Sequence, residues 1–280
     1  MQNKGRVASY PRYFRIIQQF LNHFGLAIVK IGKNDLKSDE INLNIGSGDS
    51  YLPGFINLDM PSTWYSQVQA RNRFIPFNAF TDNLPFNDKS VSNIYISHVI
   101  EHLPEDIVKR LIIDSLRCLK SEGVLRLCFP DAEFLYTVTK RAPQFWSRKE
   151  TNFFGSVAKT VLAQHDEFDY LSQELASWSR FQSDPLRLNA FEAHLQMKRS
   201  DFEETMNIAH SESQYSSEQP GRHISWWTYS KLESLRFEDS FPGTQIVQSK
   251  YQGSVSRSMT GYHFDKSVAF LSAYVEYIKA

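Results

Sequence analysis

The sequence has little of what would place it in a specialised class of proteins. Its 280 residues include only two cysteines, Cys118 and Cys128, too few for a disulfide-based scaffold. They fall in a predicted helix and a predicted core strand, so we expect reduced, buried thiols. The 31 basic and 31 acidic residues cancel, and the pI is about 7.1. The chain therefore lacks the basic field that general nucleic-acid binding requires.

Long hydrophobic runs are also missing. No apolar stretch approaches the roughly 18 residues of a membrane span, and no signal peptide is recognisable. We therefore expect a cytoplasmic protein. The hydrophobic content of 41% is that of a globular chain that can bury a large core.

A glycine turn between two strands is the most informative segment. Residues 41–60, INLNIGSGDSYLPGFINLDM, predict a strand, a turn at Gly46, Ser47 and Gly48, and a second strand that ends at Asp59. A carboxylate at the end of an adjacent parallel strand can accept hydrogen bonds from both hydroxyls of a ribose. The pattern therefore predicts a ligand that contains adenosine.

The same segment lacks the features of a dinucleotide site. Tyr51 occupies the third glycine position of the G-x-G-x-x-G pattern, and Pro53 and Gly54 leave no room for a full helix that could face a phosphate. This argues against NAD and ATP. It favours a phosphate-free ligand such as S-adenosylmethionine.

Residues 41–131 resemble the class I methyltransferases that use S-adenosylmethionine, in particular the type 11-like branch with the pattern NIGSG, GFINLD, LPF and SHVIEHL. Five segments in the order of that family carry the resemblance: residues 44–49, Asp59, residues 84–86, 97–103 and 117–125. The resemblance implies an α/β fold with a doubly wound, Rossmann-like sheet. That sheet is mostly parallel and has an antiparallel last strand.

The resemblance also implies a set of cofactor-binding residues. They are Asn44, Gly46, Ser47, Gly48, Asp59, Asn78, Ser97 and His98. Asn44 stands where the family usually has an acid, and Ser50 where it usually has the last glycine. The acid that contacts adenine in the family aligns near Asn78, with Asp82 as the competing candidate.

Four parts follow from the pattern of the whole chain. We expect an N-terminal helical extension (1–40), an S-adenosylmethionine-binding α/β core (41–131), a helical insertion after strand five that acts as a substrate lid (132–222), and the C-terminal part of the sheet (223–280). Later elements are predicted as a helix near 228–236 and strands near 244–249 and 271–278.

Two local expectations concern the first and third of these parts. Residues 10–31 have apolar side chains at helical spacing with basic neighbours, which predicts a helix packed on the core, or alternatively peripheral membrane contact or dimerisation. In the insertion, Ser200 and Glu203 resemble a capping box. Most of its aromatic residues are expected in the core.

Methyl transfer from a sulfonium is an in-line displacement, so the main task of the protein is alignment. A hydroxyl acceptor benefits from a general base, and we select His98, His223 and Asp131 as the catalytic candidates, with Glu101 and His102 behind them. His98 follows the fourth strand and is expected to line the acceptor pocket. His223 ends the insertion and can reach the pocket from there.

A metal site is the alternative interpretation of the same residues. His98, Glu101 and His102 have the spacing i, i+3 and i+4 and can share one face of a helix. However, the helix macrodipole is sufficient reason for Glu101 near a helix N-terminus. We therefore expect no metal.

The sequence favours O-methylation of a small molecule or a sugar or glycan precursor. The glycan part rests on similarity to bacterial proteins of surface-polysaccharide synthesis. The main competitor from another class is a non-catalytic protein that retains the fold to bind a partner or sense the cofactor. The enzymatic runner-up is a nucleic-acid methyltransferase, although residues 129–132, FPDA, replace the N-P-P-aromatic motif of the DNA enzymes that methylate amino groups.

Overall fold

The computed structural model describes most of the chain from residue 40 onward. The described residues are 40–48, 50, 52, 54–69, 73–146, 167–176, 196–211, 213–235, 237, 239–266 and 269–280. The predicted helix at 10–31 lies outside them, as do Tyr51 and Pro53. None of the helices in the described ranges has the length and apolar character of a transmembrane segment.

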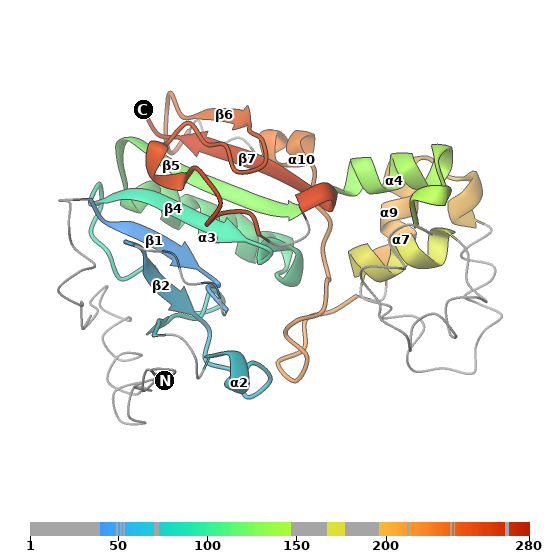
Figure 1. Cartoon of the computed structure of the whole chain (residues 1–280), viewed down its shortest axis with the longest axis horizontal. Coiled ribbons are helices and arrows are strands. Elements are labelled where there is room, and N and C mark those ends of the chain that lie inside the picture. Colours follow the sequence, from blue (N-terminus) through green and yellow to red (C-terminus); the bar gives the residue numbers. More distant parts are fainter. Residues whose placement is uncertain are drawn as a thin grey trace, which may run out of the picture.

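A single seven-stranded sheet organises the molecule (Figure 1). Its strands are β1 (Asn42–Ile45), β2 (Ile56–Asp59), β3 (Ile75–Pro76), β4 (Val91–Ser97), β5 (Leu119–Pro130), β6 (Gln245–Gln248) and β7 (Ser272–Ile278). The spatial order is β3-β2-β1-β4-β5-β7-β6. Strands β1 to β5 are parallel, whereas β7 runs antiparallel to both β5 and β6. This confirms the predicted fold class.

The strand order reverses between β1 and β4, because the chain first builds outward to β3 and then returns to the other side of β1. In open α/β sheets such a switch point leaves a crevice at the carboxyl ends of the strands, where ligands bind. All four residues of β1 are buried, as is typical of a parallel strand covered on both faces.

Helices cover the sheet and extend it. They are α2 (Ser66–Gln69), α3 (Glu105–Cys118), α4 (Ala132–Arg141), α7 (Glu167–Ala176), α9 (Phe202–His210) and α10 (Tyr229–Ser234), with short 3-10 turns η1 (Ile100–His102), η2 (Arg257–Met259) and η3 (Ala269–Leu271). Helix α3 starts directly after Pro104 and buries Leu111, Ile112 and Leu116 against the sheet. Cys118 and Cys128 are buried and free, as predicted.

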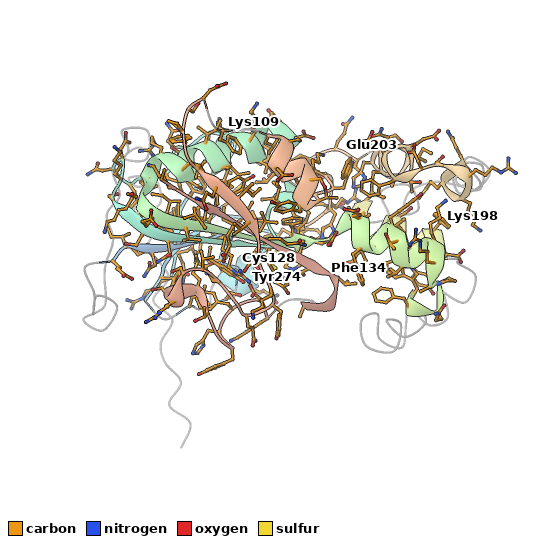
Figure 2. All side chains as sticks on the ribbon, turned by 90° about the horizontal axis from the view of Figure 1, so that it is seen from above. Lys109, Cys128, Phe134, Lys198, Glu203 and Tyr274 are labelled. Atoms are coloured by element: carbon orange, nitrogen blue, oxygen red, sulfur yellow. The ribbon has the colours of Figure 1, made fainter. Side chains whose placement is uncertain are left out.

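The insertion builds a second, smaller core. Helices α4, α7 and α9 continue outward beyond the carboxyl end of β5 (Figure 1). From above, Phe134, Lys198 and Glu203 lie toward this end of the molecule, while Cys128 and Tyr274 project from neighbouring strands of the sheet (Figure 2). Trp146 and Tyr170 are buried there and stack with their ring centroids 5.8 Å apart. Most of the aromatic residues that the structure describes in the insertion pack in this core, as expected, whereas Phe134 is exposed.

The capping box predicted at Ser200 and Glu203 is wrong by one position. The N-cap of α9 is Asp201, whose Oδ1 accepts a hydrogen bond from the backbone N–H of Glu204 (3.0 Å). Ser200 is unavailable for this role because its hydroxyl donates to the carbonyl oxygen of Gln196 (2.7 Å) and thereby closes the preceding turn.

A buried ion cluster joins the antiparallel strands β5 and β7, next to the edge strand β6. Arg126 on β5 contacts Asp265 Oδ2 at 2.6 Å and Glu276 Oε1 on β7 at 2.8 Å, and all three side chains are fully buried. The guanidinium also donates to the carbonyl oxygens of Lys250 and Gly253. Both carboxylates therefore contact the one guanidinium, and these contacts offset part of the cost of burying the charges.

Replacing Arg126 with methionine should lower the free energy of unfolding by about 3–5 kcal/mol, because two carboxylates would stay buried without a cationic partner. Urea denaturation monitored by circular dichroism measures this. The matched control is Arg257→Met, since Arg257 is exposed in the same C-terminal region. Equal stabilities of the two variants would contradict a structural role for the cluster.

Candidate functional site

A pocket opens at the switch point, at the carboxyl ends of β1, β2 and β4. It contains about 890 Å³ of space, part of it open to solvent. Ile45 and Gly46 line it after β1, Asp59 at the end of β2, and His98 after β4. Most of the other lining residues are apolar or aromatic. This position and composition are those of a small-molecule site.

The glycine turn forms one wall of the pocket. Gly46 and Gly48 both have left-handed backbone conformations, with φ of +67° and +51°. The N–H groups of Gly46 and Ser47 donate to the carbonyl oxygen of Leu58, which ties the turn to β2 (2.8 and 3.2 Å). A Cβ at Gly46 would clash with Val99. Glycine is therefore needed at Gly46 for both its conformation and its small size.

Asp59 is oriented toward the ligand space by the backbone. Its Oδ2 accepts from the N–H of Gly48 (3.0 Å) and its Oδ1 from the N–H of Met60 (2.8 Å). Burial raises the pKa of Asp59, although these hydrogen bonds oppose the shift. Each carboxylate oxygen has a further lone pair, so the group can accept more hydrogen bonds. Hydroxyl donors from a ligand would offset its desolvation.

Three other predicted cofactor-binding residues are Asn44, Asn78 and Ser97. The side chains of Asn44 and Asn78 make hydrogen bonds within the protein. The buried Asn44 donates from Nδ2 to Ser50 O (3.2 Å) and Asn57 Oδ1 (3.0 Å). Asn78 accepts at Oδ1 from the N–H of Phe80, a residue of the pocket wall. Ser97 is half-buried at the end of β4. Their contact with a cofactor stays a prediction.

Asp82, the competitor of Asn78, is also engaged locally. Its Oδ2 accepts from the backbone N–H of Asn78 at 2.9 Å, and its Oδ1 from the hydroxyl of Thr81 at 3.0 Å. These bonds close the turn that follows β3. Neither Asn78 nor Asp82 is among the residues that line the pocket.

His98 stands between Glu101 and β7. Its Nδ1 lies 3.0 Å from Glu101 Oε1, and its Nε2 lies 3.0 Å from Ser272 Oγ. Burial opposes a charge on His98, but hydrogen bonds to Cys128 and Glu101 raise its pKa well above the usual value. Burial likewise acts against the charge on Glu101, but the contact with His98 holds the pKa of Glu101 far below its usual value. The two side chains thus form an ion pair, and in this form His98 is no base.

The helix face predicted to carry His98, Glu101 and His102 is not formed. The 3-10 turn η1 begins only at Ile100, and His98 precedes it with a left-handed φ of +53°. His98 meets Glu101 through a turn of the backbone. The spacing i, i+3 and i+4 therefore does not describe how these side chains are arranged.

His223 joins this group from the far end of the insertion. Its ring lies against that of His102, with centroids 4.8 Å apart and an interplanar angle of 65°. His102 Nδ1 bonds to the carbonyl oxygen of Arg222 at 3.0 Å, and His223 Nδ1 bonds to that of Glu174 on α7. Burial lowers the pKa of His102 to about 4. Four candidates from the sequence thus gather beside the pocket.

Asp131, the remaining catalytic candidate, has a structural role in this arrangement. It is the N-cap of α4, and its Oδ1 accepts from the N–H of Phe134 at 3.1 Å. Burial raises its pKa. Asp131 does not line the pocket. A catalytic contribution from it stays a prediction.

The return segment, residues 213–222 between α9 and α10, supplies pocket residues that no motif indicated. Tyr215 and Pro220 line the pocket, and the Tyr215 ring lies 4.3 Å from that of Phe80. In Figure 1 this segment runs past the carboxyl ends of the strands toward α2. Tyr65, just before α2, also lines the pocket. Isolated aromatic residues in loops carry no periodic signal, so the sequence could not reveal them.

No family model matches the sequence, and no curated protein matches it either. Solved structures with a similar fold include the S-adenosylmethionine-dependent methyltransferase SibL (11% identity, 89% of this chain and 52% of that chain, TM-score 0.38). Others are an S-adenosylmethionine-dependent methyltransferase from Archaeoglobus fulgidus (10%, 95% and 96%, 0.40) and one from Thermotoga maritima (14%, 96% and 93%, 0.39). The present chain spans about half the length of SibL. These similarities are distant, and the fold assignment rests on the strand order itself.

Proposed function

We propose that this protein is an S-adenosylmethionine-dependent methyltransferase that modifies a hydroxyl group of a small molecule or of a sugar or glycan precursor. The observation that carries the proposal is Asp59. This carboxylate ends β2, lines the pocket and is held by the N–H of a left-handed glycine turn. That is the arrangement expected for a ribose hydroxyl pair.

The surrounding residues fit a ligand that contains adenosine but no phosphate. Among the described residues between Gly46 and Phe55 there is no helix whose N-terminus could face a phosphate. Phe77 and Phe80 provide an apolar wall on which a flat base can pack. The hydroxyl of Ser47 is buried and makes no hydrogen bond in the described part of the chain, although Ser47 is not among the residues that line the pocket.

When bound, S-adenosylmethionine supplies an electrophilic methyl group. The protein's own residues then have to align an acceptor with it and exclude water. Asp59 fixes the ribose end, and the glycine turn allows close approach of the backbone. His98, held by Glu101 and Ser272, stands at the end of β4.

Neither His98 nor His102 is suited to act as a general base in this arrangement. The raised pKa of His98 keeps it protonated, and the pKa of His102, about 4, makes it a weak proton acceptor. Alignment therefore carries more of the proposed catalysis than proton removal. His223 remains the predicted base or orienting group.

The return segment is the part of the insertion that we propose as the substrate lid. Tyr215 and Pro220 line the pocket, whereas α4, α7 and α9 pack around their own core. The cytoplasmic location and the glycan preference stay predictions from the sequence.

Asp59→Ala should weaken the affinity for S-adenosylmethionine by about 1.5–3 kcal/mol, because hydrogen bonds to a charged acceptor are lost. Isothermal titration calorimetry measures this. Asp106→Ala is the matched control, since Asp106 is exposed on α3. Unchanged affinity in Asp59→Ala would remove the basis of the proposal. Tight binding without turnover on any acceptor would instead favour a cofactor-sensing protein.

Binding of S-adenosylmethionine together with an acceptor should slow amide hydrogen exchange in residues 213–222, because a lid closes over the filled pocket. Helix α9 serves as the internal reference, since it lies outside the pocket and should exchange at the same rate in both states. Equal rates in the return segment with and without ligands would identify it as a structural brace.

A further inference from the structure

Glu101, His102 and His223 form a cluster of metal-ligand side chains beside the pocket. One potential ligand atom from each residue lies within 4.8 Å of the other two. His102 also lines the pocket, so the cluster adjoins the proposed cofactor site.

The hydrogen bonds of the two histidines fix their tautomers. A carbonyl oxygen can only accept, so His102 Nδ1 donates to Arg222 O at 3.0 Å, and His223 Nδ1 donates to Glu174 O. In a neutral imidazole with the proton on Nδ1, Nε2 carries the lone pair that binds a metal. Histidines that bind metals are generally held through the other ring nitrogen in this way.

Glu101 supplies the anionic member of the cluster. Its side chain is 2% exposed; Oε1 lies 3.0 Å from His98 Nδ1, whereas Oε2 makes no hydrogen bond within the described part of the chain. A buried carboxylate oxygen that lacks a hydrogen-bond donor is costly. A cation bound next to it would supply the missing compensation.

The backbone holds the three residues together. The N–H groups of Ile224 and Ser225 both donate to the carbonyl oxygen of Glu101, at 2.8 and 3.2 Å. Together with the bond from His102 to Arg222, they fix both neighbours of His223 to the turn that carries Glu101 and His102. The cluster is thus built by the return of the chain from its insertion, which the spacing of His98, Glu101 and His102 could not indicate.

We propose that Glu101, His102 and His223 bind one divalent transition-metal ion, with Zn²⁺ the best match to two imidazoles and a carboxylate. The ligand atoms would have to move closer to one another by about 1 Å, since zinc lies about 2.0–2.2 Å from such ligands. From the sequence we expected no metal, and this proposal replaces that expectation.

Sites with three protein ligands keep a coordination position for water or substrate. An acceptor hydroxyl in that position would have its pKa lowered by the ion. This assignment of the acceptor rests on the proposed function, whereas metal binding itself does not.

The test is calorimetric titration of Zn²⁺ into the full-length protein after treatment with a chelator and in the absence of S-adenosylmethionine. We expect one ion per chain. His102→Asn and His223→Asn should each weaken binding by at least about 100-fold, because even the loss of an outer-shell partner costs 10–100-fold. Asparagine keeps an N–H group near the Nδ1 position for the carbonyl oxygens but removes Nε2. The matched control is His263→Asn, which removes a half-buried histidine stacked on Tyr262.

Binding that persists in both asparagine variants would overturn the proposal, and so would a wild-type protein without saturable binding near one ion per chain. Circular dichroism and melting without zinc establish that the variants fold. Should one not fold, the wild-type protein loaded with Co²⁺ decides, since nitrogen and oxygen ligands give it visible absorption bands that differ from those of aqueous Co²⁺. Unchanged aqueous bands would overturn the proposal. The affinity of the same samples for S-adenosylmethionine reports separately on the proposed function.

Discussion

The candidate site depends on the attachment of the chain, as it leaves the insertion, to the turn after β4. The carbonyl oxygen of Ile100 accepts from the indole N–H of Trp227 (3.1 Å) and from the hydroxyl of Ser225 (3.0 Å). The carbonyl oxygen of Glu101 accepts hydrogen bonds from two backbone N–H groups of the same segment, those of Ile224 and Ser225. These bonds satisfy the carbonyl groups of a short 3-10 turn that no regular helix continues. They also bring His223 to a site whose other members follow β4.

Much of the sheet could be predicted because its physical signals are local. Buried strands, a proline before α3 and the threonine that caps α10 are all visible in short stretches of sequence. The end of β2 at Asp59 followed from one apolar run, and the antiparallel last strand from the resemblance to a known family. The parts that matched the structure are those in which neighbouring residues decide the conformation.

The missed features involve side chains whose partners are distant in the sequence. Arg126 has no partner near it in the sequence, because Asp265 and Glu276 follow more than a hundred residues later. Tyr215 came to the pocket from a loop without a motif. The pattern placed His98 and His102 on one helix, whereas the left-handed backbone at His98 separates them. Such a conformation is uncommon for a residue with a side chain, and no residue type announces it.

The distance along the chain between the two halves of the site has a consequence for folding. Residues joined to Ile100 stand 125 and 127 positions later, so their contacts close a long loop. The entropy cost of such closure grows only slowly with loop length, and the fold can accommodate it. In kinetic terms, however, contacts of long range form late. The glycine turn and Asp59 are close in sequence and can come together early, whereas His223 reaches Glu101 and His102 only once the insertion has folded on its own core. Synthesis of the chain from its N-terminus would thus form the Asp59 side of the pocket before the histidine cluster beside it.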